Sequence, residues 1–406
     1  MQFNEFLTEQ KNTHMTHIED KVLYGGVNGT REAINALRNL RDMLAGESSG
    51  KLSVKWDGAP AIFCGKDPRD DVFFVAKKGI FAKNPKVYKT NAEIDADMTG
   101  DLASKMKLAL KHLPDLGITD VIQGDFLFSK EDLVTDTIDG QKYTTFHPNT
   151  IIYAIPYDDA QAVRNAKIGI VWHTTYKGDD FESMKASYGV DVSKFKPSKN
   201  VWSQDAMLTN VGGATMNKKE TAEVTKNLSN AGKIFNQIAG STLRELERNQ
   251  DLATLIEQYN NTFVREGQLI PNSNTHVTGL MKWVTNKFKK EMDKRKTEKG
   301  KMVQQKKLDE IMKFFSPRNK KSLVSIFDLQ KSLVLAKLKL INKLNSIAKY
   351  DAFVQTTKGY KVKTGAEGFV AIDKLGGDAV KLVDRLEFSY NNFSPDILKG
   401  WDKPKR

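Results

Sequence analysis

Hydrophobic residues follow two different spacings along this chain. Residues 30–46 and most of residues 203–350 carry apolar side chains every three or four positions, the spacing of one face of a helix. Residues 51–178 and the stretch after residue 350 instead carry short apolar runs bounded by Gly, Pro, Asp and Asn, which is typical of strands. The pattern predicts a β-rich unit that is interrupted by a helical segment and then resumed.

The first helix is expected within "TREAINALRNLRDMLAG". Thr30 is a suitable N-cap residue and Gly46 a suitable stop. The apolar stripe between them consists of Ile34, Leu37, Leu40 and Leu44. Residues 1–50 therefore form a predicted helical lead-in.

The β-rich unit is expected to be an α+β region built largely from antiparallel strands. Its predicted strands lie in residues 51–56, 61–65, 71–79, 121–128, 150–157 and 168–176 and, after the interruption, in 353–362, 368–373 and 379–388. A helix is expected at 105–113, between two of these runs.

The interrupting segment is strongly helical. One apolar stripe is Val224, Leu228, Ala231, Phe235 and Ile238, and another is Val277, Leu280, Met281, Val284 and Phe288. Residues 321–350 form a further long amphipathic pattern, and the polar residues 179–200 mark a boundary. The predicted division is 1–50, helical lead-in; 51–178, first part of the β-rich core; 179–350, helical lysine-rich insertion; and 351–406, second part of the core.

Charge is concentrated in that insertion. The 406-residue chain has a net charge of +13, yet residues 282–349 hold 20 Lys and Arg against 6 Asp and Glu. The remainder is close to neutral, so an anionic partner would meet this segment. Its exposed basic residues are predicted to contact nucleic acid, although lysine-rich solvated helix faces are equally common. The residues nominated are Lys287, Lys289, Lys290, Lys294, Arg295 and Lys296.

The composition excludes several kinds of site and of cellular location. A single cysteine, Cys64, excludes an intramolecular disulfide and a cysteine-based zinc cluster. No apolar run approaches the length of a membrane span, and the N-terminal residues lack a secretory pattern. We expect no membrane partner and a cytoplasmic location. The six scattered histidines offer no zinc cluster, so His147 and His173 are expected to be structural or to contact substrate.

The stretch "KLSVKWDGAPAIF" places charged residues between two apolar runs. Strand alternation puts Lys55 and Asp57 on one face, and Gly58 permits a tight turn and close approach of a ligand. Because a partly desolvated lysine favours the neutral amine, Lys55 is a candidate nucleophile.

Other ionisable residues lie in similar strand-like surroundings. Asp125 follows Gly124 in "VIQGDFLFS", Glu367 precedes a glycine in "GAEGFVAID", and Lys381 lies within "GGDAVKLVDR". Asp125 and Glu367 could hold a divalent cation through oxygen atoms. Lys381, with Lys77 or Lys78 of "FVAKKGIF", could neutralise phosphate charge.

In order, these motifs resemble those of the covalent nucleotidyltransferase superfamily, which comprises ATP-dependent DNA and RNA ligases and mRNA capping enzymes. The resemblance covers residues 51–178 and 351–390. It implies an ATP-grasp-like nucleotidyltransferase core and a lysine that attacks the α-phosphate of ATP, or of GTP, with Mg²⁺ or Mn²⁺. The implied lysyl–nucleotide intermediate forms on Lys55.

The resemblance also assigns roles to other residues. Lys55, Asp57 and Lys381 are the implied catalytic residues, and Glu367 and Asp125 the implied metal ligands. The nucleotide-binding set adds Val54, Gly58, Lys77, Lys78, Asp125, Phe146, Tyr153, Glu367 and Lys381. Within it, Asp125 is implied to contact the ribose, and Phe146 or Tyr153 to stack on the base.

Two departures qualify the resemblance. Ala59-Pro60-Ala61 follows the first motif in place of the family's usual residues, and Val383 replaces the second lysine of the last motif. Only 25 residues follow Lys381, too few for a C-terminal OB domain, which favours a divergent, phage-type or RNA-ligase-like protein. The alternatives are nucleotidyl transfer to a protein or small molecule, and a non-catalytic nucleic-acid-binding or structural protein on this scaffold.

Overall fold

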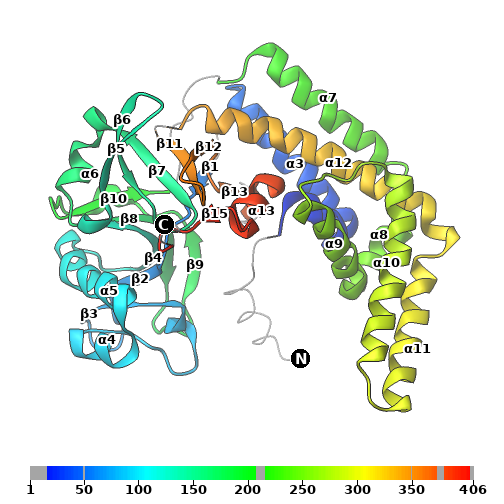
Figure 1. Cartoon of the computed structure of the whole chain (residues 1–406), viewed down its shortest axis with the longest axis horizontal. Helices are drawn as coiled ribbons and strands as arrows, with labels where there is room; N and C mark the ends of the chain where they lie inside the picture. The colour runs from blue at the N-terminus through cyan, green and yellow to red at the C-terminus, as the bar shows by residue number, and fades with distance from the viewer. Residues whose placement is uncertain (1–15, 49–50, 207–214, 349, 373–378, 403–406) are drawn as a thin grey trace.

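A computed structural model describes residues 16–48, 51–206, 215–348, 350–372 and 379–402. Figure 1 shows a β-rich region beside a helical region, so the predicted mixed α+β class with antiparallel sheets is confirmed. The strands are β1 (Lys51–Lys55), β2 (Ala61–Lys66), β3 (Phe73–Ala76), β4 (Val121–Ser129), β5 (Val134–Ile138), β6 (Gln141–Phe146), β7 (Ile151–Pro156), β8 (Ile168–Lys177), β9 (Lys185–Tyr188), β10 (Val201–Asp205), β11 (Asp351–Thr356), β12 (Lys361–Thr364), β13 (Gly368–Ile372), β14 (Ala379–Leu382) and β15 (Ile397–Leu398).

The helices fall into two groups. Those in or beside the β-rich region are α4 (Asn91–Asp97), α5 (Gly100–His112), α6 (Gln161–Asn165) and α13 (Arg385–Phe393). Those of the helical region are α2 (Lys21–Tyr24), α3 (Gly26–Leu44), α7 (Lys218–Phe235), α8 (Gly240–Arg248), α9 (Gln250–Arg265), α10 (Ser273–Asp293), α11 (Glu298–Phe314) and α12 (Pro317–Asn345).

Three sheets make up the β-rich region. A three-stranded sheet has the order β1-β13-β14, so it pairs a strand from the first part of the predicted core with two strands from the second part. A second has the order β10-β8-β4-β2-β3 with β9 beside β8, and a third the order β12-β11-β7-β6-β5 with β15 beside β11. Among the described residues, all their strand pairs are antiparallel except β8 with β10. Because β11–β14 come from the end of the chain, both parts of the predicted core contribute to shared sheets.

The helical region includes the N-terminal lead-in. Helix α3 contacts α7, α8 and α12, and its apolar stripe is buried with theirs in one core. Both predicted stripes of the insertion face that core, although Ile238 lies beyond the end of α7. The long pattern at 321–350 forms most of α12.

Several predicted boundaries are wrong. Helix α3 begins at Gly26, and the hydroxyl of Thr30 donates to the Gly26 carbonyl within the helix instead of capping it. The core does not end at residue 178, because β9 and β10 join its second sheet.

The last predicted strand is also too long. In 379–388 the strand stops at Leu382, because the carboxylate of Asp384 accepts from the amides of Leu386 and Glu387 and starts α13. Parts of these predictions lie outside the described residues: 1–15 and 49–50 of the lead-in, 207–214 of the insertion, 349 of the long amphipathic pattern and 373 of a predicted strand.

Candidate active site where three sheets meet

Lys55 and Lys381 belong to the three-stranded sheet, and Glu367 immediately precedes its strand β13. Lys55 ends β1 and lies opposite Gly368. Its ammonium group forms an ion pair with the carboxylate of Glu367, the residue before Gly368. Lys381 lies opposite Val370, which is itself opposite Ser53. Since directly opposed residues share a face and strand residues alternate, Lys381 and Lys55 lie on the same face of the sheet.

The Lys55 ion pair is open to solvent on one side. The Lys55 side chain is 30% exposed and that of Glu367 9%. Burial raises the pKa of Glu367, and the positive charge of Lys55 only partly offsets this. Burial, assisted by the charge of Lys55, lowers the pKa of Lys381. The amines of Lys55 and Lys381 and the carboxyl of Glu367 therefore share a partly desolvated environment.

Asp57 is buried and anchors the first motif to the third sheet. Its carboxylate accepts from the side-chain amide of Asn149 at 2.7 Å and from the backbone amides of Thr150 and Ile151 at 2.7 and 3.0 Å. Its own amide donates to the hydroxyl of Tyr153 at 2.6 Å. With three donors on one carboxylate, Asp57 fixes the end of β1 against the start of β7.

The turn after Asp57 leads into the second sheet and lies against Asp125. A Cβ atom on Gly58 would lie 2.5 Å from the Cβ of Asp125, so only glycine fits there. The amide of Ala59 donates to the Phe126 carbonyl at 3.0 Å, and Ala61 then pairs with Asp125 as β2 begins. The sequence "KWDGAPA" thus brings Lys55 of one sheet beside Asp125 of another.

Asp125 faces His173 from the neighbouring strand. Asp125 Oδ2 lies 3.9 Å from His173 Nε2, and the side chains are 21% and 28% exposed. Burial raises the pKa of Asp125 to about 7, with Lys55 opposing and Asp57 adding to the shift. Burial and the charge of Lys55 lower the pKa of His173 to about 4, so its imidazole is neutral at neutral pH.

The two aromatic residues proposed to stack on a base are in the core. Tyr153 and Phe146 are 0% and 1% exposed. Trp56, one residue after Lys55, packs against the rings of Tyr153 and Tyr350 with centroid distances of 4.7 Å to each, and the two tyrosine rings lie 5.4 Å apart, so the three rings form one cluster. In this arrangement the rings hold the motif in place, and a base could stack on Tyr153 or Phe146 only after repacking.

The remaining nucleotide-binding candidates differ in burial and in their distance from solvent-exposed surface. Val54 is buried, and its amide donates to the carbonyl of Ala206 at 2.9 Å, so it is a framework residue. Strand β3 ends at Ala76 opposite Phe63, and Lys77 and Lys78 therefore follow at the end of the sheet that carries Asp125. Lys77 Nζ lies 3.6 Å from Asp97, whereas Lys78 is exposed.

Sequence reasoning missed the C-terminal contribution to this region. Lys399 Nζ donates to the hydroxyl of Thr150 at 2.6 Å, and the amide of Gly400 donates to the Asn149 carbonyl, also at 2.6 Å. These contacts hold the loop that binds Asp57. The sequence around Lys399, "NNFSPDILKGW", contains no pattern that would predict a contact with residues about 250 positions earlier.

A metal ion would find few protein ligands here. Among the described residues there is no group of three or more His, Cys, Asp and Glu side chains able to hold a metal ion. Asp125 and Glu367 are both close enough to Lys55 for its charge to act on their pKa values. They fit a Mg²⁺ ion that takes one or two carboxylates and completes its shell with water and substrate phosphates.

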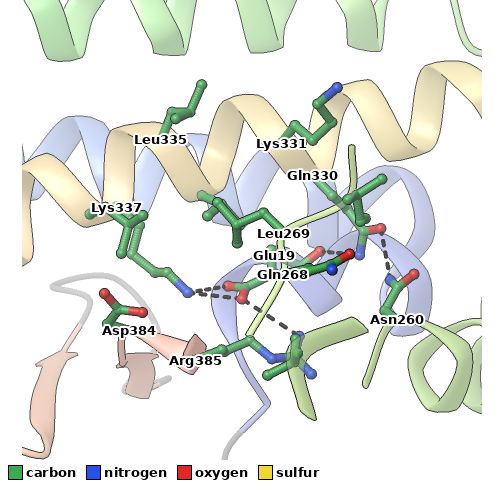
Figure 2. Close-up of a pocket in the computed structure, with 14 residues that line it drawn as sticks. Glu19, Asn260, Gln268, Leu269, Gln330, Lys331, Leu335, Lys337, Asp384 and Arg385 are labelled. Atoms are coloured by element: carbon green, nitrogen blue, oxygen red, sulfur yellow. Dashed lines mark hydrogen bonds and ion pairs between the residues drawn. The ribbon is translucent and has the colours of Figure 1, made fainter. Parts of the chain in front are cut away.

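A second Lys–Glu pair lies deeper, between the helical region and β14. Lys337 Nζ of α12 donates to both carboxylate oxygens of Glu19 at 2.8 Å, and the two side chains are 1% and 4% exposed. Arg385, which begins α13, pairs with Asp20 at 2.8 Å. Figure 2 shows Glu19, Lys337 and Arg385 turned toward one another beside a cavity of about 120 Å³ with otherwise mostly apolar walls.

The nominated nucleic-acid-binding residues lie on the α10–α11 hairpin. Lys289, Lys290, Lys294, Arg295 and Lys296 are exposed near its tip, and Lys287 Nζ lies 5.3 Å from the centre of the Trp283 ring. The hairpin projects away from the sheets in Figure 1, so these residues are remote from Lys55.

The chain belongs to a family of unknown function (DUF6267), whose model matches residues 12–396. No curated protein matches the chain, and no solved structure does. No described helix has the length and apolarity needed to cross a membrane.

Proposed function

We propose that this protein is an ATP-dependent nucleotidyltransferase that forms a covalent lysyl–AMP intermediate at Lys55 and passes the nucleotide to a polynucleotide end. The observation that carries the proposal is the position of Lys55 and Lys381 on one face of a small sheet, with Glu367 paired to Lys55 and Asp125 brought alongside by the Gly58 turn. Two further features support it: the order of the motifs, and the partly exposed state of Lys55.

The first chemical step follows from these positions. The neutral amine of Lys55 attacks the α-phosphorus of ATP, a P–N bond forms, and the P–O bond to the β-phosphate breaks to release pyrophosphate. The amine must first lose a proton, and Glu367, which already contacts it and whose pKa is raised, is the acceptor at hand. Lys381 then offsets the negative charge that develops on the α-phosphate.

A divalent metal ion, when bound with the nucleotide, would supply additional positive charge at the phosphates. Asp125 would then be its protein ligand, with water and the substrate phosphates completing the shell, because Glu367 takes the proton from Lys55. Asp57 acts as a positioning residue, because its carboxylate accepts three hydrogen bonds from the 149–151 loop.

Covalent labelling tests the proposal. The protein is incubated with α-labelled ATP or GTP and Mg²⁺ or Mn²⁺, and label that survives denaturing electrophoresis is measured. We expect label on the wild type and none on Lys55→Ala, with Lys66→Ala, an exposed strand lysine, as the matched control that keeps it. Absence of label in the wild type, or label unaffected by Lys55→Ala, would falsify the mechanism.

The acceptor is identified by a chase. Labelled protein is mixed with nicked DNA, nicked RNA or single-stranded RNA, and we expect label to move to one of them. Transfer to none of these acceptors, with label stable on the protein, would redirect the proposal to a protein or small-molecule acceptor.

The basic hairpin is the proposed polynucleotide grip, on the ground of its exposed cationic tip. Each phosphate that a substitution leaves unneutralised should reduce the slope of log affinity against log salt by about 0.7–0.9. We expect Lys289→Glu with Lys290→Glu to weaken binding of single-stranded RNA and to flatten that slope, while nucleotide labelling of Lys55 is unchanged. An unchanged slope would assign the hairpin's charge to solubility alone.

A further inference from the structure

Exposed aromatic side chains gather near the end of the described chain. Among the described Phe, Tyr and Trp residues, the exposed ones are Tyr188, Tyr360, Tyr390, Phe393 and Trp401. The last three lie within residues 390–401 and are 54%, 72% and 65% exposed. A phenylalanine has no polar atom to offset its contact with water, so a group of this kind marks an interaction surface. We call Tyr390, Phe393 and Trp401 the C-terminal rings.

Two of the C-terminal rings follow residues that are bound to the 149–151 loop. Asn392, just before Phe393, accepts a hydrogen bond from a hydroxyl of this loop at 3.3 Å. The amide of Gly400, just before Trp401, donates to a carbonyl of the loop at 2.6 Å. Because the same loop binds the carboxylate of the first motif, these rings are held close to the candidate active site.

Phe388 connects Phe393 to the lysine that the proposed mechanism sets against the α-phosphate. The Nζ atom of Lys381 lies 5.2 Å from the centre of the Phe388 ring. The ring centres of Phe388 and Phe393 are 6.5 Å apart, and the ring planes are nearly perpendicular, at 79°. Phe388 also lines a small cavity together with Glu367. Helix α13, which carries both rings and lies beside β15 in Figure 1, therefore forms part of the rim of the site.

The surroundings of these rings suit nucleobases better than a protein partner. A protein interface needs a contiguous apolar patch. The exposed large aliphatic side chains of the described chain all lie on other segments, namely Val72, Val134, Leu269, Met302, Val303, Leu335 and Val362. A nucleobase needs only a ring on which to stack, whatever its sequence context. Lys399, two residues before Trp401, adds positive charge that suits a phosphate-bearing strand.

We propose that the C-terminal rings stack on unpaired bases of the strand that receives the nucleotide, so that the acceptor is single-stranded at its reactive end. This inference rests on the proposed function, because it takes that end to lie beside Lys55. The base faces of a duplex are covered by neighbouring base pairs and could not stack on Phe393 or Trp401. The basic hairpin then holds phosphates, while the C-terminal rings hold bases.

A binding test separates stacking from charge. The full chain is titrated with a dye-labelled single strand of oligo(A) RNA of about twelve nucleotides, and with an abasic strand of the same length and charge. Because stacking is lost without bases, we expect the wild type to bind oligo(A) about tenfold or more tightly than the abasic strand.

Two truncations and one conservative replacement test the rings themselves. Phe393→Ala and Trp401→Ala should each weaken oligo(A) binding about tenfold without changing its slope against salt, because no cation is removed. Trp401→Phe keeps a ring and should retain most of the affinity. It should also abolish the quenching of tryptophan emission by oligo(A), because the other four tryptophans are buried or half-buried. The control, Val72→Ala, truncates an exposed apolar side chain of another segment and should bind oligo(A) as the wild type does.

The outcomes distinguish this inference from the proposed function. If the wild type binds both strands equally, or if both alanine variants keep its preference, stacking is overturned even when ATP labels Lys55. If the preference depends on the rings but no label forms on Lys55, the proposed function fails, and the strand's role as acceptor fails with it. Thermal unfolding shows whether the alanine variants are folded, and the loss of quenching in Trp401→Phe decides the question if they are not.

Discussion

The molecule contains two lysine–glutamate pairs in contrasting surroundings. Lys337 and Glu19 are enclosed between α12 and the N-terminal segment, with two equal hydrogen bonds and Arg385 nearby. Lys55 and Glu367 lie at a strand end, with the lysine 30% exposed. The same two residue types thus give a closed pair in one place and a partly solvent-exposed pair in the other.

The net pKa shifts of their glutamates have opposite directions, although burial acts the same way on both. Burial by itself raises the pKa of Glu19, but the charges of Lys337 and Arg385 outweigh it and hold the pKa at about 2. At Glu367 burial wins, and the pKa is raised. A buried ion pair is stable when all its charges are matched, and a raised carboxyl pKa such as that of Glu367 is the imbalance frequently found at functional sites.

The largest expected effect is on stability and separates the two lysines. Lys337→Met leaves Glu19 buried without its main partner, and we expect a loss of about 3–5 kcal/mol in the free energy of unfolding. Lys55→Met should cost about 1 kcal/mol or less, because its pair is partly exposed and Glu367 can take up a proton. Urea denaturation measures both.

Lys339→Met is the matched control for the buried lysine. It lies on the same helix, and its ion pair with Glu223 is roughly half exposed on both sides, so its loss should change stability by less than about 1 kcal/mol. Equal losses for the Lys337 and Lys339 variants would contradict the distinction.

A smaller effect is expected from Asp57, which belongs to the open site but is itself enclosed. Asp57→Asn replaces one accepting oxygen by an amide group that faces a donor, and we expect a loss of about 1.5–3 kcal/mol. Asp71→Asn, at an exposed carboxylate, is the control and should be nearly neutral. A stability equal to the wild type would show that the 149–151 loop does not anchor Asp57.

The finest test follows the two glutamates with pH. The depressed pKa of Glu19 means that its contribution to folding is complete above about pH 4.5 and is lost as the pH falls toward 2. The raised pKa of Glu367 gives the opposite sign: its contribution is complete below about pH 4.5 and declines as the pH rises through the folded-state pKa. Carboxyl NMR titration, assigned with Glu19→Gln and Glu367→Gln, should find the two pKa values on opposite sides of 4.5.

Local patterns predict the elements better than their partners. The apolar runs around Lys55, Asp125 and Lys381 identify β1, β4 and β14 because alternation and turn residues act over a few positions. The strands β5 and β6 are not predicted, since polar residues such as Gln141 and Lys142 weaken the apolar signal.

Long-range contacts account for the rest. In the sequence Asp57 has the appearance of a catalytic group because only its own neighbours are visible, and the donors from Asn149 and Thr150 lie more than 90 positions away. His173 is visible as a histidine in a strand, but the β8 bulge that turns it toward Asp125 depends on the register of two strands. The sequence identifies such residues as candidates, but strand pairing between distant segments determines which groups lie opposite them.

The packing of α3 has a consequence for how far the two regions can be separated. The helical region resembles a module that could be excised between β10 and β11, yet α3 enters it from the other end of the chain, shortly before β1. A deletion of residues 217–345 would strip the cover from Ile34, Leu37 and Leu40, which are now buried. Any shortened version of this protein must therefore redesign its first long helix, and the two regions can be exchanged between relatives only together with that helix.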